Sequence, residues 1–338
     1  MKSFAAAALV ASVTAIDNAT FDFMKYVSEH GKSYTTVEEF NMRQALFAER
    51  NEFIQAFNAD TNNTSRVGHN FLSDWTAEEL KNLRGLDTTH VNDEEPTHFA
   101  TQEVSAVSTY NWCSTENDMS KDKCTPVKNQ GQCGSCWAFS ATETVESAIA
   151  IFNDATPVQY SPQQLVSCSS AYGNGGCNGG WYYYAWNYLK THAQVSEADY
   201  PYTSGNFGIT GTCTVNESQG LVNTDSPTDY VRVGHTNADM MTAIKRQPTS
   251  VAIDASSSTF NYYTTGVITS GCGTSIDHAV VAVGYGTENG TDYFLVRNSW
   301  GSSWGDNGFV KIAQSSTNGQ PGYCGINTDP YYPNARYA

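Results

Sequence analysis

Two cysteines, Cys133 and Cys136, lie three residues apart in the glycine-bearing segment NQGQCGSCWAFS, which leads directly into an apolar, helix-like stretch. A C-x-x-C pair by itself fits a disulfide, a metal site, a redox pair or a nucleophile. A thiol reacts as its thiolate, and a helix N-terminus next to an imidazolium lowers its pKa enough to supply that form. Apolar residues after Cys136 recur at helical spacing, and Ser135 is a possible N-cap. We therefore expect Cys136 in the first turn of a helix.

A nucleophilic thiol needs a base, and a base needs an orienting group. Of the seven histidines, His278 opens the apolar, strand-like run HAVVAVGYG, where a buried edge can fix its ring. Asn298 ends the next predicted strand and could hold the second ring nitrogen. Gln130, with the backbone N–H of Cys136, could donate to an oxyanion. Taken singly, His278 is more simply a core histidine and Gln130 a surface turn residue, but together they supply every role of acyl transfer.

Composition and charge bound the class of protein. The chain has 338 residues, 40% of them hydrophobic, which suffices for one large globular unit or two smaller ones. A formal charge of -16 argues against nucleic acid or an anionic membrane as the main partner. The opening MKSFAAAALVASVTAIDN is typical of a signal peptide, with a buried N-terminal helix as the alternative, and no segment has the roughly 18 apolar residues of a membrane span.

Secretion makes the nine cysteines readable as a disulfide framework, in which an odd number leaves one thiol unpaired. Parity alone does not say which one. Glycosylation sequons agree weakly with a secretory route and begin at Asn18, Asn62, Asn63, Asn216 and Asn289.

The chain divides into regions of different character. Every cysteine follows residue 112, so we expect a signal peptide at 1–16, a helical region at 17–86, a linker at 87–106 and the main domain at 107–338. A capping box at Thr36 and Glu39 opens a long helix. Strand patterns follow at 250–254, 279–285, 293–297 and 309–312. Helices before strands predict an α+β protein with a helical lobe, a β lobe and a cleft between them.

At this point the chain resembles the papain-like cysteine proteases, and among them the cathepsin L-like branch. The motifs that carry the resemblance are PVKNQGQCGSCWAFS, GCNGG, DHAVVAVGYG, NSWGSSWGDNGF and YCGI, in the order of the family. The resemblance covers nearly all of the chain after the signal peptide and implies the two-lobed papain-like fold. It also implies that Cys136 is the nucleophile, His278 the general acid/base, Asn298 the orienting residue and Gln130 the oxyanion donor. No metal or organic cofactor is implied.

The helical region resembles the inhibitory propeptide of that family. One helix face carries residues at steps of three and four. The alternative is an ordinary amphipathic helix with a few surface ion pairs. Arg50 departs from the family pattern, where Asn is usual, and this puts one polar bridge in doubt. The resemblance implies a zymogen in which the helical pro-domain lays the linker, residues 87–106, through the cleft and blocks the thiol. The matching residues are Glu39, Arg43, Phe47, Ile54, Asn58, Gly68, Asn70, Leu72 and Asp74.

The disulfides implied by the resemblance are Cys133–Cys177, Cys168–Cys213 and Cys272–Cys324. These leave Cys113, Cys124 and Cys136. The segment between Trp112 and the thiol motif is longer than usual and carries both extra cysteines, so we predict that Cys113 and Cys124 close a small loop of their own.

Substrate contacts follow from the same resemblance. The backbone of Gly180 would pair with the substrate as an added strand, and an apolar pocket would take the side chain two positions before the scissile bond. An apolar floor favours Leu, Val or Phe, whereas a carboxylate from Asp329 would also accept Arg; alternatively Asp329 points to solvent. The predicted substrate-binding residues are Gly179, Gly180, Trp181, Tyr182, Ala252, Ala279, Trp300 and Asp329.

The remaining expectations concern partners and rival functions. We expect polypeptide substrates, inhibitors of cystatin type, a monomer, and a lysosome, digestive vacuole or extracellular location, with acid activation through carboxylates such as Asp74. Rival interpretations are a thioredoxin-like oxidoreductase, a zinc site from Cys133, Cys136, Cys168 and Cys177, and an inactive papain-like binder or inhibitor.

Overall fold

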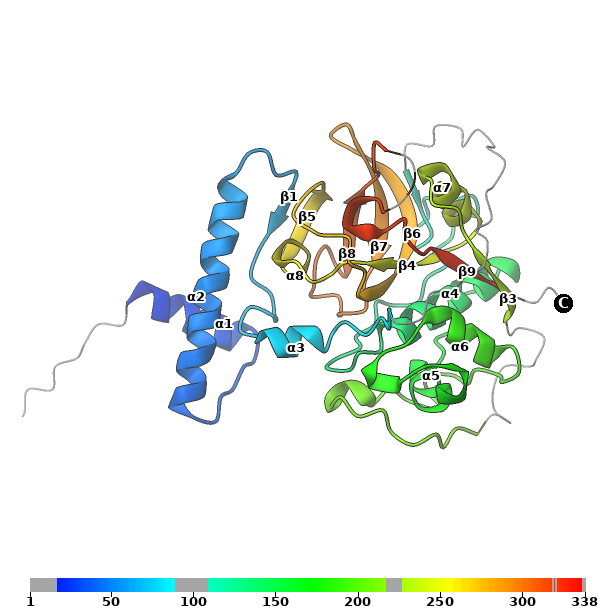
Figure 1. The fold of residues 1–338 in the computed structure, drawn as a ribbon, viewed down its shortest axis with the longest axis horizontal. Helices are drawn as coiled ribbons and strands as arrows, with labels where there is room; N and C mark the ends of the chain where they lie inside the picture. Colours follow the sequence, from blue (N-terminus) through cyan, green and yellow to red (C-terminus); the bar gives the residue numbers. More distant parts are fainter. Residues whose placement is uncertain (1–16, 89–108, 217–226, 318, 320, 336–338) are drawn as a thin grey trace, which may run out of the picture.

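The structure is a computed structural model that describes residues 17–88, 109–216, 227–317, 319 and 321–335 (Figure 1). The predicted signal peptide and nearly all of the predicted linker lie outside these residues. Figure 1 shows the N-terminal helices as a separate unit beside a larger body, joined to it by a segment that runs into that body.

The N-terminal unit consists of α1 (Asn18–Glu29), α2 (Val37–Ala59), β1 (Ser65–Val67) and α3 (Ala77–Lys81). The side chain of Thr36 caps α2 by accepting the N–H of Glu39, as predicted. The carboxylate of Glu39 accepts the N–H of Thr35 rather than that of Thr36, so the predicted capping box is only half formed. Thr76 and Glu79 form the complete box, at the start of α3.

One face of α2 holds this unit together. Phe47 and Ile54 are buried, and Asn58 exchanges two hydrogen bonds with the backbone of Val67 in β1. Arg43 reaches Glu79 at 2.5 Å and the carbonyl of Asp74 at 2.9 Å. The predicted face of α2 therefore contacts the segments that follow the helix. Its apolar residues pack against them, and its buried polar residues form hydrogen bonds with them.

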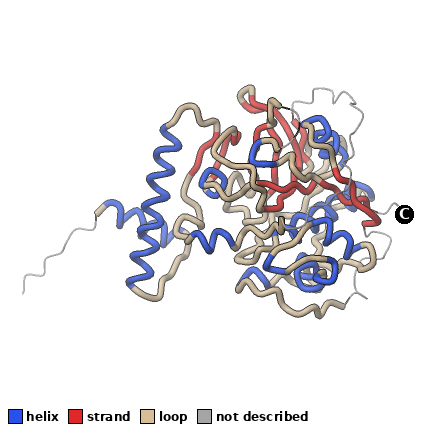
Figure 2. Tube along the Cα trace, viewed as in Figure 1, coloured by secondary structure: helices blue, strands red, loops and turns tan. Residues whose placement is uncertain are grey.

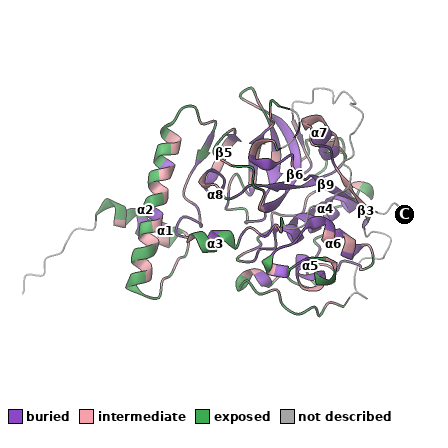
Figure 3. Cartoon of the chain, viewed as in Figure 1, coloured by how far each residue is buried: buried purple, intermediate pink, exposed green. Residues whose placement is uncertain are grey.

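The helical lobe of the larger body contains α4 (Cys136–Phe152), α5 (Pro162–Cys168) and α6 (Tyr182–Leu189). Figure 3 shows α4 as a buried element at the centre of the molecule, and every residue from Cys136 to Ala150 is buried. Ser135 stands at the N-cap position without a capping hydrogen bond, because its hydroxyl lies 2.8 Å from that of Tyr202. The predicted cap at Ser135 is thus wrong in its hydrogen bond.

The β lobe is built on one curved sheet, drawn in red in Figure 2. The strand order is β1-β5-β8-β7-β6-β4-β9-β3, with β2 paired to β6. All four predicted strands are present as β4, β6, β7 and β8. Its elements are β2 (Thr109–Asn111), β3 (Pro227–Arg232), α7 (Asn237–Arg246), β4 (Thr249–Ile253), α8 (Ser258–Asn261), β5 (Tyr263–Ile268), β6 (His278–Glu288), β7 (Thr291–Arg297), β8 (Phe309–Ala313) and β9 (Tyr331–Ala335).

The N-terminal unit and the larger body share a sheet, and disulfides cross-link the larger body. Strand β1 of the N-terminal unit pairs with β5, so the sheet continues from one unit into the other. Disulfides link Cys113 to Cys124, Cys133 to Cys177, Cys168 to Cys213 and Cys272 to Cys324. Short 3-10 helices occupy Ser170–Tyr172, Gly176–Asn178, Ser204–Asn206 and Tyr323–Gly325. Among the described residues, no helix combines the length and apolar character needed to cross a membrane.

Candidate active site

The thiol of Cys136 lies at the first residue of α4 and is fully buried. Among the described cysteines it is the one without a disulfide. Its sulfur accepts the backbone N–H of Ala279 at 3.4 Å, so the residue before Ala279 in the chain, His278, begins β6 beside the sulfur. The α4 N-terminus favours an anion at this atom.

The ring of His278 has a hydrogen-bond partner at one nitrogen and none at the other. Its Nε2 lies 2.8 Å from Oδ1 of Asn298, which directly follows β7, the antiparallel neighbour of β6. The indole of Trp300 lies 4.9 Å from the imidazole, centroid to centroid. Nδ1 is buried and makes no hydrogen bond. The second nitrogen is therefore available for a proton from a group beside it, as a general acid/base requires.

Gln130 is completely buried, not a surface turn residue. Its Nε2 donates to the carbonyls of Leu83 and Cys133, each at 2.9 Å, and its Oε1 accepts the hydroxyl of Ser299 at 2.7 Å. Ser299 follows Asn298, so one short segment fixes both the histidine ring and the glutamine amide. The amide already binds a carbonyl oxygen here, which is the kind of acceptor that an oxyanion site receives.

A segment of the N-terminal unit covers the sulfur. The N–H of Gly85 donates to Sγ of Cys136 at 3.3 Å. Gly85 approaches so closely that a Cβ there would lie 1.9 Å from the carbonyl oxygen of Gly134, so no larger residue fits. Gly180 donates to the carbonyl of Gly85 at 3.0 Å, and Leu86 forms a parallel bridge with Gly180. The segment thus lies along the cleft as a short added strand.

Enclosure changes the protonation of the two reactive groups. Burial raises the pKa of the Cys136 thiol from 9.0 to about 11, although the N–H groups of Ala279 and Gly85 oppose this. Burial likewise lowers the pKa of His278 from 6.5 to about 4, although the hydrogen bond that its Nε2 donates to Asn298 opposes this. Both charged forms lose hydration when the cleft is closed. In this covered state burial therefore favours the neutral thiol and the neutral imidazole over the ionised pair expected from the sequence.

Four of the eight residues predicted to bind substrate share one buried cluster, whereas Trp300 belongs to the core of the β lobe. Trp181, Tyr182, Ala252 and Ala279 belong to one buried apolar cluster, and the side chain of Leu86 packs against it. The indole N–H of Trp181 donates to the carbonyl of Asp87. Gly179 has φ 123°, which favours glycine, and its ideal Cβ would meet Gly85 at 3.1 Å.

Asp329 does not point to solvent. Its side chain is 10% exposed and forms an ion pair with Arg232 of β3, with 3.3 Å between Oδ1 and Nη2. Burial raises the pKa of Asp329 to about 6, against the effect of Arg232. The alternative of an exposed carboxylate is therefore wrong.

The propeptide-like residues also have identified contacts. Asp74 is buried and accepts hydrogen bonds from Tyr26, Lys32 and Tyr34 at 2.7 to 2.8 Å. Asn70 donates to the carbonyl of Asn261, across the boundary between the two units. Further predicted members, Gly68 and Leu72, lie on the same stretch, and Leu72 is fully buried. Arg50, the residue that put one polar bridge of the family in doubt, lies over the ring of Tyr262, 6.0 Å from its centroid.

The structure argues against a redox dithiol and against a zinc site at the C-x-x-C motif. Cys133 is joined to Cys177, which leaves no dithiol for redox exchange with Cys136. Cys168 is joined to Cys213. The four cysteines considered for zinc therefore cannot bind it together, because only Cys136 among them is outside a disulfide. In the described part of the chain, no group of three or more His, Cys, Asp or Glu residues is arranged to hold a metal ion.

Sequence reasoning missed the residues that cover the site. Leu83, Arg84, Gly85 and Leu86 precede the linker 87–106 that we expected to run through the cleft. The signal that could have found them is a glycine with a leucine two residues before it and another directly after it. Arg84 forms an ion pair with Asp277 at 2.8 Å, next to His278. Nothing in local spacing points to Arg232 or to this pair, because both are made by tertiary contacts.

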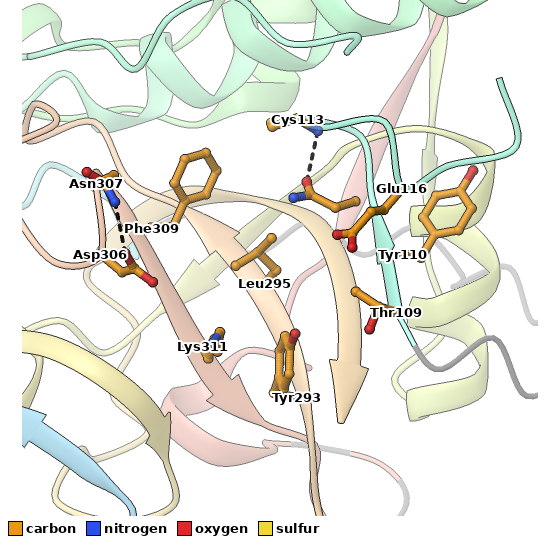
Figure 4. A pocket seen from close by; sticks show the side chains of 11 residues that line it. Thr109, Tyr110, Cys113, Glu116, Tyr293, Leu295, Asp306, Asn307, Phe309 and Lys311 are labelled. Carbon is orange, nitrogen blue, oxygen red and sulfur yellow. Dashed lines mark hydrogen bonds between the residues drawn. The ribbon is translucent and has the colours of Figure 1, made fainter. Parts of the chain in front are cut away.

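A separate pocket of about 340 Å³ lies away from the thiol, between β2 and the strands β7 and β8 (Figure 4). Tyr293, Leu295 and Phe309 face it from the sheet, and Glu116 faces it from the loop after β2. None of the predicted catalytic residues lines this pocket.

Comparisons with known proteins agree with this geometry. The model of the papain family cysteine protease domain matches residues 112–334, and that of the cathepsin propeptide inhibitor domain matches residues 23–80. Digestive cysteine proteinase 3 of Homarus americanus is 37% identical over 335 residues, which cover 97% of this chain and 98% of that protein.

Two solved structures share the whole arrangement. The recombinant stem bromelain precursor has a TM-score of 0.81 at 33% identity, with 95% of this chain and 100% of that chain covered. Digestive procathepsin L2 proteinase from the larval midgut of Tenebrio molitor has a TM-score of 0.81 at 30% identity, with 94% and 99% covered.

Proposed function

Since the chain belongs to the papain family of cysteine proteases and is made as a zymogen with a cathepsin propeptide inhibitor domain, we propose how its residues cleave a peptide bond and how the precursor prevents this. The predicted family, fold and enzyme class are confirmed by the matches over nearly the whole chain. The roles of individual residues are the proposal.

The thiolate of Cys136 attacks the scissile carbonyl carbon and forms a C–S bond, which places a negative charge on the carbonyl oxygen. Nε2 of Gln130 and the backbone N–H of Cys136 donate to that oxyanion. His278 gives its proton to the leaving amine as the C–N bond breaks. Water, deprotonated by His278, then attacks the thioester and releases the acid and the thiol. Asn298 keeps the imidazole oriented at Nε2, so that Nδ1 serves the reaction.

The observation that carries this proposal is the convergence on one sulfur of the α4 N-terminus and of β6, where His278 begins. The amide of Gln130 lies in the same place, since it binds Leu83 two residues before the glycine that contacts the sulfur. No single motif brings these elements together. Their joint presence is what acyl transfer needs and what an inert binding protein would not require.

The precursor is held back by what faces the sulfur. The group that contacts Sγ is the N–H of Gly85, a hydrogen-bond donor. Leu86 pairs with Gly180 in the parallel sense, and we propose that a substrate pairs there in the opposite sense, which would turn its carbonyl toward the thiol. The pro-segment therefore takes the place beside Gly180 where we propose that a substrate strand pairs.

The enzyme acts on polypeptides, and we propose a preference for an apolar side chain two positions before the scissile bond. Support comes from Leu86, which packs against the buried apolar cluster that includes Trp181, Tyr182, Ala252 and Ala279. Four disulfides fit the secretory pathway, and a digestive or lysosome-like compartment or the extracellular space is our proposal for the site of action. A monomer, sensitive to inhibitors of cystatin type that enter the same cleft, completes the proposal.

Turnover of a fluorogenic Phe-Arg dipeptide amide by the processed enzyme tests these roles. We expect activity that is lost in Cys136→Ser and in His278→Ala, and stoichiometric labelling of Cys136 by an epoxysuccinyl inhibitor. Full activity in Cys136→Ser, or a label mapped to another residue, would reject the proposed nucleophile.

A further inference from the structure

One tyrosine hydroxyl contacts both ends of the segment that carries the two proposed oxyanion donors. Oη of Tyr202 lies 2.8 Å from the backbone carbonyl oxygen of Gln130 and 2.8 Å from Oγ of Ser135, the residue directly before Cys136. A carbonyl oxygen only accepts, so Tyr202 donates its single hydrogen to Gln130 and accepts the hydrogen of Ser135. The hydroxyl therefore links the backbone at Gln130 to the residue that precedes α4.

The ring of Tyr202 gives this hydroxyl a fixed position. It meets the ring of Phe139, which belongs to α4, edge to face with centroids 4.8 Å apart. Burial raises the pKa of the Tyr202 hydroxyl, so the group keeps the proton that it donates. The segment that follows also holds the turn that carries the amide donor, because the carbonyl of Gly205 accepts the N–H of Gln132 at 2.9 Å. Residues 202–205 thus support the turn, and Tyr202 also reaches the start of α4.

This link bears on the reaction because an oxyanion donor acts only at a set distance. Donors must lie about 2.7 to 3.1 Å from the oxygen that becomes charged, and a misplacement of about 1 Å can cost roughly a hundredfold in rate. The Gln130 amide is fixed within its turn by the Cys133 carbonyl at 2.9 Å, and to the β lobe by Ser299 at 2.7 Å. Tyr202 adds the connection to α4, whose first residue, Cys136, supplies the second donor.

Ser135 shows where its hydroxyl would turn without this partner. It stands at the N-cap of α4, where a serine side chain usually accepts an N–H of the first helical turn, yet it makes no such bond. Its Oγ is also 3.4 Å from the carbonyl of Cys133, which already accepts Nε2 of Gln130. Release of Ser135 from Tyr202 would bring its hydroxyl into competition for that carbonyl and loosen the amide donor.

Resting on the proposed function, in which Gln130 donates to the oxyanion, we propose that Tyr202 is a positioning residue for peptide-bond hydrolysis. Its hydroxyl sets the place of the turn that carries the Gln130 amide relative to the helix that carries the Cys136 N–H. Both donors then reach the same carbonyl oxygen. Tyr202 acts through these two groups and not by contact with the substrate.

The test is Tyr202→Phe, which removes only the hydroxyl and keeps the ring that packs on Phe139. In the processed enzyme, counted by titration with an epoxysuccinyl inhibitor, we expect kcat/KM for the Phe-Arg dipeptide amide to fall about tenfold. The fall should lie in kcat, because the oxyanion forms only as the carbonyl is attacked. Alkylation of Cys136 by iodoacetamide forms no oxyanion, so its rate and pH profile should stay those of wild type.

A second variant shows whether the effect passes through the amide donor. In Gln130→Ala the donor that Tyr202 positions is already absent, so adding Tyr202→Phe should lower kcat/KM by about twofold or less. A residue that merely supports the fold would lower kcat/KM by the same factor in both backgrounds.

Tyr200→Phe is the matched control. The hydroxyl of Tyr200 also donates to a backbone carbonyl, that of Thr212 at 3.1 Å, so the variant loses the same atom and the same kind of hydrogen bond. Neither residue belongs to the segment 130–136, and we expect kcat/KM to stay within about twofold of wild type.

Three results would contradict this role. An unchanged kcat/KM in Tyr202→Phe means that the hydroxyl does not position the donors. An equal fall in the alkylation rate means that it serves the thiol or the fold instead, and a full fall in the Gln130→Ala background means that it does not act through Gln130. If Tyr202→Phe does not fold, Ser135→Ala breaks the link at its other end and carries the same expectations. Full activity of Gln130→Ala would instead reject the proposed oxyanion role, so the two failures are distinguishable.

Discussion

The pro-domain should lose stability between neutral and mildly acidic pH because of one histidine. His69 stacks on Phe47 with ring centroids 4.1 Å apart, and its nitrogens lie 3.0 Å from the hydroxyl of Ser73 and 3.3 Å from Oδ1 of Asn51. Burial, together with the nearby His30, lowers the pKa of His69 from 6.5 to about 4, against the effect of Asp22.

The sign of the effect follows from the direction of that shift. Below pH 6.5 the unfolded pro-domain binds a proton at His69 that the folded form refuses down to about pH 4. The stabilising contribution is therefore complete above the ordinary pKa and is lost as the pH falls. From a folded pKa of about 4, linkage gives a loss of about 2 kcal/mol between neutral pH and about pH 5, a factor of roughly 30 in opening.

Other charged groups beside His69 shape the baseline. A cavity of about 280 Å³ next to the ring is lined by Asp22, Lys25, Tyr26, Glu29, His30, Phe47, Asn51 and His69. The Arg43 hydrogen bond lowers the pKa of Glu79, so the stability that this pair gives is lost as the pH falls below the usual carboxylate range. Between neutral pH and about pH 5 the Glu79 carboxylate stays ionised, so this pair does not add to the loss that His69 causes.

The assay is hydrogen exchange of α2 amides in the full-length Cys136→Ser precursor, which cannot process itself. His69→Gln keeps hydrogen-bonding groups near Ser73 and Asn51 but cannot take up a proton. Between neutral pH and about pH 5 the opening free energy should fall in both proteins. We expect the fall in His69→Gln to be smaller than the fall in wild type by about 2 kcal/mol. His192→Gln, in the helical lobe, is the control and should behave as wild type. Equal losses in His69→Gln and wild type would refute the reasoning.

Three further predictions concern charges and cross-links. Arg84→Gln removes the ion pair with Asp277, so Cys136 in the precursor should react with a thiol reagent roughly fivefold faster, as expected for a pair worth about 1 kcal/mol; an unchanged rate would contradict this. Arg297→Met leaves the buried Glu143, whose pKa burial raises to about 7, without its ion-pair partner. The free energy of unfolding should fall by about 3 to 5 kcal/mol above pH 7, and by less at pH 5, where Glu143 takes up a proton. A loss that does not depend on pH would argue against this. Replacing Cys113 and Cys124 together by Ser should lower the free energy of unfolding by about 2 to 3 kcal/mol, and no change would show that their loop does not restrict the unfolded chain.

Much of the site could be predicted from sequence because its residues sit in local patterns. Cys136 opens a helix, His278 opens an apolar strand and Asn298 ends the next one, and these patterns survive in α4, β6 and β7. The disulfides join the predicted pairs. Gln130 was harder, since a turn residue gives no sign that it will be fully buried.

The rest could not be predicted because it arises between distant segments. Gly85 meets Cys136 only when the N-terminal unit docks on the larger body, and the docking is set by contacts such as Asn70 with Asn261. The pairing of Arg232 with Asp329 depends on the register of β3 against β9, which a single sequence does not specify. The neutral state of the thiol also follows from enclosure, not from its neighbours in the chain.

The account's central claim is that the sulfur of Cys136 is a nucleophile activated by His278 and covered by the pro-segment. The rate of alkylation of Cys136 by iodoacetamide, mapped by mass spectrometry and followed from about pH 4 to pH 9, tests it most directly. Processed enzyme should react fast down to about pH 4 or 5, and His278→Ala should show an ordinary thiol profile that rises only near pH 8 to 9, as expected for an unperturbed cysteine. The full-length precursor should react slowly throughout. A processed enzyme with the ordinary profile, or a precursor that reacts as fast as the processed form, would contradict the account.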